Sequence, residues 1–147
     1  MEIERGGFTI SDDPARLDRD AIQRFLADSY WAKGIPRDVV DRSIDGSLPF
    51  GVYEGDALVG FARVITDYAT YAYVADVFVL ESHRGRGVAL WLMQTIRAHP
   101  RLQGIRRWNL VTRDAQPLYR KVGFREVENP SRWMEIVDRE IYTRRKL

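Results

Sequence analysis

The sequence contains no cysteine and only two histidines, His83 and His99. Without cysteine there can be no disulfide framework, no thiolate metal site and no cysteine nucleophile, and two histidines are too few for a zinc cluster. We therefore expect no bound metal, and redox and zinc chemistry are set aside.

Long hydrophobic runs are also missing, because no apolar stretch approaches the roughly 20 residues that cross a bilayer. The first residues, Met1 to Glu4, lack the basic region and apolar core of a signal peptide. Apolar content of 45% with 30% charged residues is typical of a folded chain. We expect a soluble cytoplasmic protein with no membrane partner, folded as one domain over residues 1–147.

The net charge of +2 conceals an uneven distribution. Residues 1–83 carry −7, residues 84–125 carry +9, and residues 126–147 sum to zero. The basic centre suits either a nucleic acid or a small molecule with several phosphate groups. No base-stacking motif or recognition-helix pattern accompanies this charge, so we expect no nucleic-acid partner.

Hydrophobic periodicity predicts a mixed α/β protein. Helices are expected at four places, namely residues 18–29, 36–43, 89–98 and 115–122. Strands are expected at seven places, namely residues 7–10, 50–53, 58–65, 71–80, 108–111, 124–127 and 133–137.

The segment from Val77 to Ala89 runs from a strand through a glycine-rich loop into a helix. Free N–H groups and the macrodipole at a helix start bind phosphate, and glycines at 85 and 87 let a diphosphate approach the main chain. Arg84 and Arg86 add positive charge. The Lys-Ser/Thr of a P-loop and the third glycine of a dinucleotide fingerprint are absent. The alternative is an ordinary solvated turn.

A second segment, Thr112 to Phe124, runs from a strand into a short helix that ends in Gly-Phe. The pair Arg84-x-x-Gly87-x-Ala89 and Ala115-x-x-Leu118-Tyr119-x-x-x-Gly123-Phe124 resembles the two signature segments of the GNAT superfamily of acetyl-CoA-dependent N-acetyltransferases. The order of elements from Phe8 to Val137 matches as well. The resemblance implies a single α/β (α+β) domain with a mostly antiparallel mixed sheet, splayed middle strands and flanking helices.

The resemblance also implies that acetyl-CoA is the acetyl donor and assigns residues to it. Main-chain groups of Val77, Phe78 and Val79 would face the pantetheine arm, and Thr112, at a position often held by Asn, would lie beside the cofactor. The diphosphate would be held by the loop and helix start, that is, by Arg84, Gly85, Arg86, Gly87, Val88, Ala89 and Leu90.

Amide formation from a thioester needs a neutral amine, a donor to the developing oxyanion and an acid for the departing thiolate. Tyr119 is the candidate acid, and a main-chain N–H near Phe78 or Val79 is the candidate oxyanion donor. Asp76, in an otherwise apolar strand, has three readings: a base, an anchor for an ammonium group, or a structural carboxylate paired with an arginine such as Arg63.

Tyr30, Trp31, Tyr71 and Tyr73 are candidates for the acceptor wall, with simple packing as the alternative. Trp133 is a candidate for the opposite side. We expect acetyl transfer to a primary amine of a small molecule or peptide by direct attack in a ternary complex. The acidic first segment tilts the expectation towards a cationic amine. The alternative is a non-catalytic acyl-CoA-binding or sensing module. The acceptor's identity and a homodimer formed through sheet edges are left open.

Overall fold

The computed structural model describes residues 1–144, and its centre is a six-stranded sheet with the strands in sequence order. Neighbouring strands are antiparallel except for the last pair, which is parallel. The strands are β1 (Glu2–Arg5), β2 (Phe8–Ser11), β3 (Leu48–Glu54), β4 (Ala57–Thr66), β5 (Tyr71–Val79) and β6 (Arg107–Asn109).

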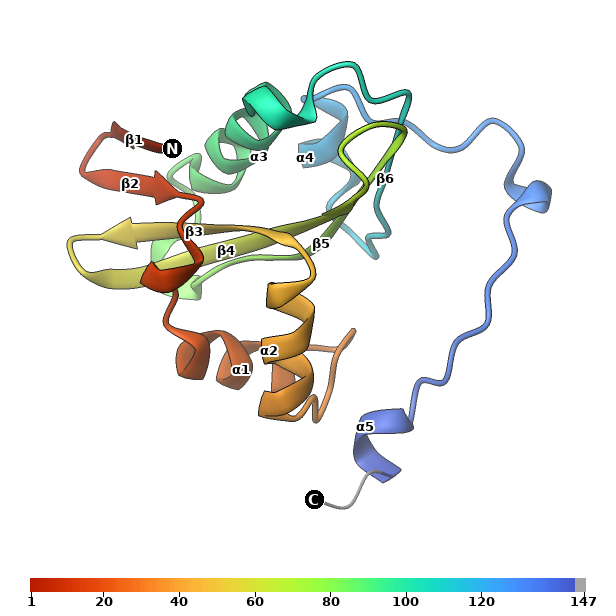
Figure 1. The fold of residues 1–147 in the computed structure, drawn as a ribbon, viewed down its shortest axis with the longest axis horizontal. Coiled ribbons are helices and arrows are strands. Elements are labelled where there is room, and N and C mark those ends of the chain that lie inside the picture. Colours follow the sequence, from red (N-terminus) through yellow and green to blue (C-terminus); the bar gives the residue numbers. More distant parts are fainter. Residues whose placement is uncertain (145–147) are drawn as a thin grey trace.

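Helices cover both faces of this sheet, as Figure 1 shows. The α-helices are α1 (Arg19–Ala27), α2 (Arg37–Asp45), α3 (Val88–Ala98), α4 (Gln116–Arg120) and α5 (Ile141–Arg144). Short 3₁₀ turns lie at Pro14–Arg16, Glu81–His83, Pro100–Leu102 and Pro130–Arg132. Among residues 1–144, no helix has the length and apolarity needed to span a membrane.

Two hydrophobic clusters follow from the alternation of side chains along the strands. Leu92, Met93 and Ile96 of α3 pack with Phe50 and Val74 on one face of the sheet. On the other face, the buried side chains of α1 and α2 pack against the sheet, and the cluster includes Ile22, Leu26, Val40, Ile44, Phe61 and Phe78. The sheet is therefore buried on both sides where its central strands lie.

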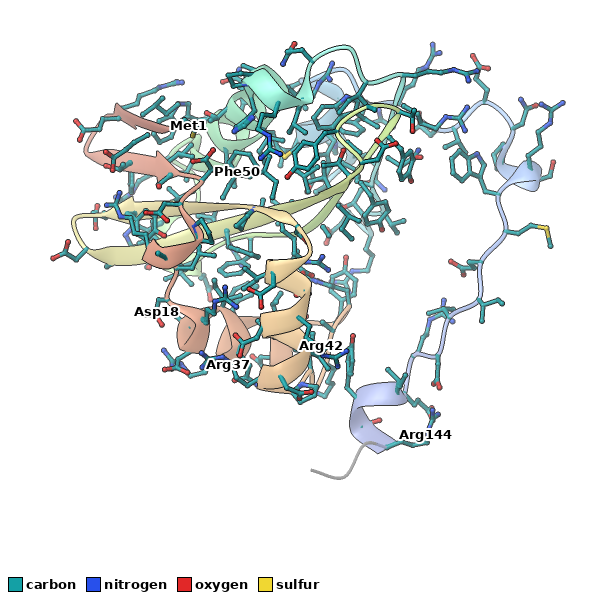
Figure 2. All side chains as sticks on the ribbon, in the orientation of Figure 1. Met1, Asp18, Arg37, Arg42, Phe50 and Arg144 are labelled. Carbon is teal, nitrogen blue, oxygen red and sulfur yellow. The ribbon has the colours of Figure 1, made fainter. Side chains whose placement is uncertain are left out.

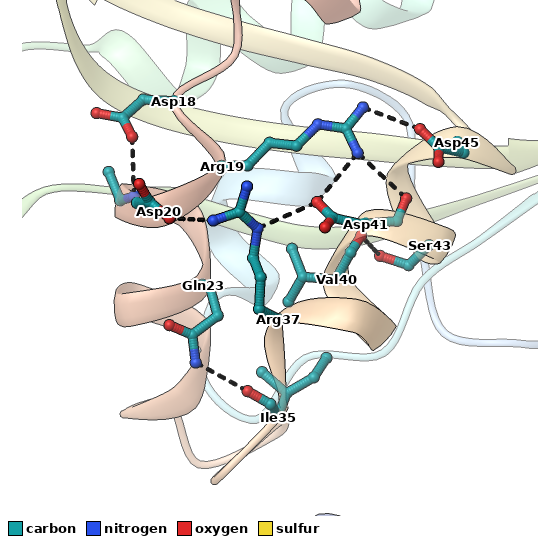
Figure 3. Close-up of polar contacts among 11 residues, drawn as sticks. Asp18, Arg19, Asp20, Gln23, Ile35, Arg37, Val40, Asp41, Ser43 and Asp45 are labelled. Carbon is teal, nitrogen blue, oxygen red and sulfur yellow. Dashed lines mark hydrogen bonds and ion pairs between the residues drawn. The ribbon is translucent and has the colours of Figure 1, made fainter. Parts of the chain in front are cut away.

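An ion-pair network fastens α1 to α2 on their outer surface (Figure 3). Arg19 reaches Asp41 at 3.2 Å and Asp45 at 2.9 Å. Arg37 donates to Asp41 at 3.1 Å and also pairs with Asp20. These pairs are exposed or only partly buried and each is worth little by itself, but the network links the two helices that carry one wall of the site described below.

Most expected elements are confirmed, and the central helices and strands lie close to their predicted bounds. The sequence reading missed β1, because all of its residues are exposed and it carries no hydrophobic signal. It was wrong about the last two strands: residues 124–127 and 133–137 form no strand. Their alternation of apolar and polar residues satisfies the strand pattern, but no neighbouring strand of the described chain pairs with them.

Candidate active site

The last two strands of the sheet separate after pairing for a short distance. β5 and β6 are joined at Tyr71–Arg107, Ala72–Trp108 and Tyr73–Asn109, where β6 ends. The second half of β5 therefore has no strand on that side among residues 1–144. This confirms the expected splay and leaves main-chain polar groups of β5 open to a ligand, since an unpaired strand edge needs hydrogen-bond partners.

A β-bulge in β5 lies at the start of this opening. Arg63 of β4 faces Ala75, whereas Phe61 faces Phe78, so β5 holds one extra residue. Asp76 has a φ of +56°, a left-handed conformation that Asp tolerates better than most residues. The extra residue moves the side chains that follow it to the opposite face of the sheet. Val77 therefore packs with the cluster on the α3 side, although simple alternation from Val74 would place it on the other face.

The bulge also determines which main-chain groups face the opening. The carbonyl oxygen of Phe78 lies against Gly60 of β4, and the N–H of Leu80 donates to Val59 at 2.8 Å. Since successive residues alternate, the main-chain groups of Val79 point away from β4. Its carbonyl oxygen accepts from Arg84 Nε at 3.1 Å. The Val79 N–H is therefore the donor directed into the opening.

The loop after β5 leads directly into α3 and has the features of an anion site. Gly85 and Gly87 have φ values of +80° and +75°, and a Cβ on either would meet open space. Gly87 is the N-cap residue; no side chain caps α3, and its first turn contains no acidic residue. The N–H groups of Val88, Ala89 and Leu90 are thus free of side-chain caps at the positive end of the helix dipole.

Tyr119 of α4 is buried in the α3-side cluster that also includes Val79, with 8% of its surface exposed. Its ring lies edge-on to Phe124 at 6.0 Å. Burial raises the pKa of Tyr119 to about 12, and the neighbouring hydroxyl of Tyr30 adds to this rise. The Tyr119 hydroxyl therefore keeps its proton at neutral pH and is available as a proton donor.

A row of aromatic rings leads from the sheet to the α1–α2 connection. Phe78 stacks on Phe25 with ring centroids 3.8 Å apart, and Trp31 lies 6.4 Å from Phe25. Tyr30 packs edge-on against Trp31 at 5.2 Å. The guanidinium of Arg113 lies 3.9 Å from the Tyr30 ring centroid, so the loop before α4 contacts the α1–α2 connection. The predicted wall residues Tyr30 and Trp31 thus lie near the loop that leads into α4, the helix that carries Tyr119.

Both carboxylate oxygens of Asp76 have partners. Arg63 Nε donates to Oδ2 at 2.6 Å and Trp31 Nε1 donates to Oδ1 at 2.9 Å. Arg63 also donates to the hydroxyl of Ser47 at 3.0 Å. The side chain of Asp76 is only 9% exposed. Of the three sequence interpretations, the carboxylate paired with Arg63 is the geometry observed.

The remaining predicted residues lie around this centre with different roles. The hydroxyl of Thr112 accepts from the N–H of Ala115 at 3.0 Å, so it is used within the chain. Tyr71 and Tyr73 alternate with Ala72 and Val74 of the α3-side cluster and therefore face the side of α1 and α2. Burial raises the pKa of Tyr73, which also lies near Asp76.

Sequence reasoning missed Phe25 and Arg113 as parts of the wall. Phe25 has the spacing of an ordinary core residue on α1, and nothing in the sequence places Arg113 near Tyr30. Among residues 1–144, no group of three or more His, Cys, Asp or Glu side chains could hold a metal ion.

Comparisons with known proteins agree with this geometry. The family of acetyltransferase (GNAT) domains matches residues 45–126. A Gibberella zeae protein assigned to the acetyltransferases is 33% identical over 140 residues, covering 80% of this chain and 78% of that protein. A Xanthomonas campestris protein of the GNAT family has a crystal structure that is 46% identical, with a TM-score of 0.91 over 95% of this chain and 99% of that one.

A more distant structure shares the fold alone. A Clostridium acetobutylicum protein described as a predicted acetyltransferase, crystallised with acetyl-CoA, is 16% identical, with a TM-score of 0.64 over 88% of this chain and 94% of that one. The family match extends over the splayed strands and the glycine loop. The chain therefore belongs to the GNAT family of acetyltransferases.

Proposed function

We propose that this protein transfers the acetyl group of acetyl-CoA to a primary amine on a small molecule or peptide, by direct attack within a ternary complex. The observation that carries the proposal is the opening between β5 and β6, with the Val79 N–H directed into it and Tyr119 in the same buried cluster as Val79. A donor for an oxyanion and a donor for a leaving group are the two things that aminolysis of a thioester needs.

The residues at the start of α3 fit the diphosphate of such a donor. The open space over Gly85 and Gly87 admits a ligand to the main chain, and the first turn of α3 has no acidic residue to compete. The guanidinium of Arg86 is about half exposed and can reach a phosphate. Acetyl-CoA bound to the Clostridium acetobutylicum protein, which has the same fold, supports this assignment.

Bound acetyl-CoA supplies a thioester carbonyl carbon for the amine to attack. In our proposal the Val79 N–H donates to the carbonyl oxygen, where negative charge develops. A fixed main-chain donor of this kind needs no reorganisation during the reaction and is worth roughly 10²–10³ in rate. The β-bulge at Asp76 keeps this stretch of β5 in place, because it is tied to β4 on both sides of the extra residue.

Tyr119 then protonates the departing sulfur. With a pKa of about 12, its hydroxyl is a weaker acid than an alkyl thiol, whose pKa is about 8.5. The phenol can therefore give up its proton only as it receives another, and the proton lost by the attacking nitrogen is the one available. Tyr119 ends the reaction neutral, and no acyl group is attached to the protein.

Asp76 acts in our proposal as a positioning residue. Its two oxygens hold Arg63 and Trp31, so it fixes both the bulge and the aromatic wall. Because both carboxylate oxygens already accept hydrogen bonds from these side chains, we assign Asp76 no part in proton transfer. The ammonium form of the acceptor would lose one proton to solvent before attack, and the attacking nitrogen would then pass a second proton to Tyr119.

The acceptor would lie against Tyr30 and Trp31, which are 54% and 42% exposed. The net negative charge of residues 1–83 does not narrow the class of acceptor amine. Many of its carboxylates, such as Asp20, Asp41 and Asp45, are paired with arginines in the α1–α2 network (Figure 3). The amine class therefore rests on the chemistry of the site and not on net charge.

Two measurements test the proposal together. Isothermal titration with acetyl-CoA should show binding in the micromolar range, and a thiol-release assay across a panel of primary amines should show turnover with at least one of them. Binding without turnover on any amine would support a non-catalytic acyl-CoA-binding module instead. Absence of binding at millimolar acetyl-CoA would overturn both.

A further inference from the structure

The aromatic wall formed by Tyr30 and Trp31 is open to solvent although it is made of large rings. The two residues are 54% and 42% exposed, even though they contact each other and Trp31 also contacts Phe25. Phe25 in turn stacks on the buried ring of Phe78. Exposed rings that are held in place by their neighbours present a surface for an apolar group of a ligand.

The carboxylate at this wall is already neutralised. Asp76 accepts from Trp31 and forms an ion pair with Arg63, whose Nε lies 2.6 Å from Oδ2. The side chains of Asp76 and Arg63 are only 9% and 16% exposed. Asp76 therefore offers no unpaired negative charge to an acceptor.

Arg113 is a cation at the same wall whose hydrogen-bond donors are not used. Its guanidinium lies 3.9 Å from the ring centroid of Tyr30, and its side chain is 63% exposed. Its one ion pair within residues 1–144 is with the exposed Asp114, where Nη2 lies 3.8 Å from the carboxylate. That distance exceeds a hydrogen bond, and an exposed pair of this kind is worth little. The donors of this guanidinium therefore remain for a ligand.

Arginines of the neighbouring helix are committed to the fold instead. Arg37 and Arg42, which lie in the layer of α1 and α2 below the sheet in Figure 2, pair with Asp41 at 3.1 Å and with Asp38 at 3.5 Å. Arg113 comes from a different part of the chain, the loop between β6 and α4, and brings its charge to the wall from outside this network.

Tyr30 links this cation to the proposed proton donor. Its ring carries the guanidinium of Arg113, and its hydroxyl lies close enough to Tyr119 to contribute to the raised pKa of that phenol. Arg113 and Tyr119 are thus both neighbours of one side chain. An acceptor with its nitrogen at Tyr119 and an anionic group at Arg113 carries the two groups only a few bonds apart.

We propose that the acceptor amine is the α-amino group of a free amino acid with an apolar or aromatic side chain. Arg113 binds its carboxylate, and Tyr30 and Trp31 cover its side chain. Arginine suits this role because its planar fork meets both oxygens of a carboxylate. This acceptor class rests on the acetyl transfer proposed above and excludes amines that carry no anionic group.

Electrostatics separates this class from a cationic amine. A second ammonium group on the acceptor would place like charges side by side at Arg113, which disfavours binding. The carboxylate of an amino acid is attracted there, while its ammonium group gives one proton to solvent. The α-nitrogen then forms the amide bond as the C–S bond breaks, and its second proton passes to Tyr119, which protonates the sulfur. The products are an N-acetyl amino acid and free CoA.

The first test is a thiol-release assay at saturating acetyl-CoA with two acceptors that differ only in the carboxylate, phenylalanine and phenethylamine. We expect kcat/KM to be at least about tenfold higher for phenylalanine. Phosphoethanolamine, which has an anionic group but no apolar body, should be a poorer acceptor than phenylalanine. Equal use of phenylalanine and phenethylamine would overturn the proposal, and so would a preference for phosphoethanolamine.

Arg113→Ala should remove this preference. We expect kcat/KM for phenylalanine to fall about 10–100-fold, because a charge-assisted pair with the carboxylate is lost, while the value for phenethylamine stays within about twofold. Arg113→Lys keeps the charge without the planar fork and should lie between. Equal falls with both acceptors would show that Arg113 only holds Tyr30 in place, and would overturn its contact with the acceptor.

Arg101→Ala is the matched control. The guanidinium of Arg101 also lies 3.9 Å from a tyrosine ring centroid, that of Tyr68, in the turn at the opposite end of β5 from Val79. The variant should leave the kinetics with both acceptors unchanged, and its loss of Tm should be similar to that of Arg113→Ala. An equal loss of acceptor preference in the two variants would overturn the specific role of Arg113.

A binding measurement separates this acceptor class from the transfer reaction. Phenylalanine and phenethylamine are titrated into protein saturated with free CoA, which has no acetyl group to transfer. We expect phenylalanine to bind at least about tenfold more tightly, and Arg113→Ala to abolish the difference. Turnover of amines without a preference in either assay would overturn the amino acid class and leave the acetyl transfer standing. Preferential binding of phenylalanine without turnover on any amine would overturn the transfer and leave the carboxylate site standing.

Discussion

The indole Nε1 of Trp31 donates a hydrogen bond of 2.9 Å to Oδ1 of Asp76, across a separation of 45 residues in the sequence. This bond joins the aromatic wall of the α1–α2 connection to the bulge in β5, at the mouth of the splayed strands. A wall residue and the main chain that faces the opening are thus held by one carboxylate.

Asp76→Asn should therefore weaken acceptor binding more than chemistry. The Asn side-chain amide has one acceptor oxygen where the carboxylate has two, so it cannot accept from Arg63 and Trp31 as Asp76 does. We therefore expect the KM for the acceptor amine to rise about tenfold with a small change in kcat. Loss of the charged partner of Arg63 should lower the free energy of unfolding by about 1–3 kcal/mol. Steady-state kinetics and urea unfolding measure the two effects.

Asp114→Asn is the control for this variant, since Asp114 is exposed and lies 3.8 Å from Arg113. It should change neither quantity. A large fall in kcat for Asp76→Asn, with loss of the acidic limb of the pH profile, would instead identify Asp76 as a base.

Tyr119→Phe should lower kcat by roughly 10²-fold or more, because proton donation to the departing sulfur is lost. The dissociation constant for acetyl-CoA should stay nearly the same. Tyr53→Phe is a well-matched control: the hydroxyl of Tyr53 is buried without a partner among residues 1–144, so its removal leaves none of these groups unsatisfied. Equal turnover in the two variants would remove Tyr119 from the mechanism.

The pH dependence of kcat provides a second test of Tyr119 as the proton donor. Its pKa is raised to about 12, so the active, protonated phenol persists as the pH rises through 10, where an ordinary tyrosine ionises. We expect no loss of kcat near pH 10 from this group in stopped-flow pH-jump assays. A decline centred at pH 10 that disappears in Tyr119→Phe would contradict the raised pKa.

Gly87→Ala should weaken acetyl-CoA binding about tenfold. Its φ of +75° places a Cβ in a strained conformation at the N-cap of α3, next to the N–H groups proposed to hold the diphosphate. Gly55→Ala, in the β3–β4 turn with a φ of +60°, should cost similar stability without affecting binding. Isothermal titration with acetyl-CoA and thermal unfolding, measured on both variants, separate the effect of backbone strain from the loss of contact with the ligand.

The turn between β4 and β5 should make the protein sensitive to acid. The carboxylate of Asp67 accepts from Thr70 Oγ1 and from the N–H groups of Thr70, Ala69 and Tyr71, which together hold its pKa well below the usual range. Its contribution to stability is present above the unfolded pKa of about 3.9 and is lost as the pH falls towards the folded value. Asp67→Asn should flatten the decline in Tm between pH 5 and pH 2, read by differential scanning calorimetry.

Local features of the chain were predictable because their causes are local. The start of α3 is marked by Gly85, Gly87 and the apolar spacing that follows, and the structure places the loop and helix there. The starts of α1 and α2 follow in the same way from the Asp18 cap and from Pro36. Elements whose signal lies within one turn or one strand need no tertiary information.

Features that depend on what a segment packs against were not predictable. The strand pattern at residues 133–137 is real, but a strand exists only beside another strand, and the described chain provides none there. β1 is a strand despite having no buried residue, because it pairs with β2. In both cases a neighbouring strand determines whether the segment forms a strand, and the segment's own sequence does not show whether such a neighbour exists.

The sequence by itself determined the family resemblance, the order of the elements from β2 to α4, and the residue types available for chemistry at Tyr119 and in the glycine loop. Only the tertiary structure decided which main-chain groups face the opening, since one extra residue in β5 reverses the faces. It also decided that Asp76 is bound by Arg63 and Trp31, because their contacts join residues far apart in the chain and such distances carry no local signal.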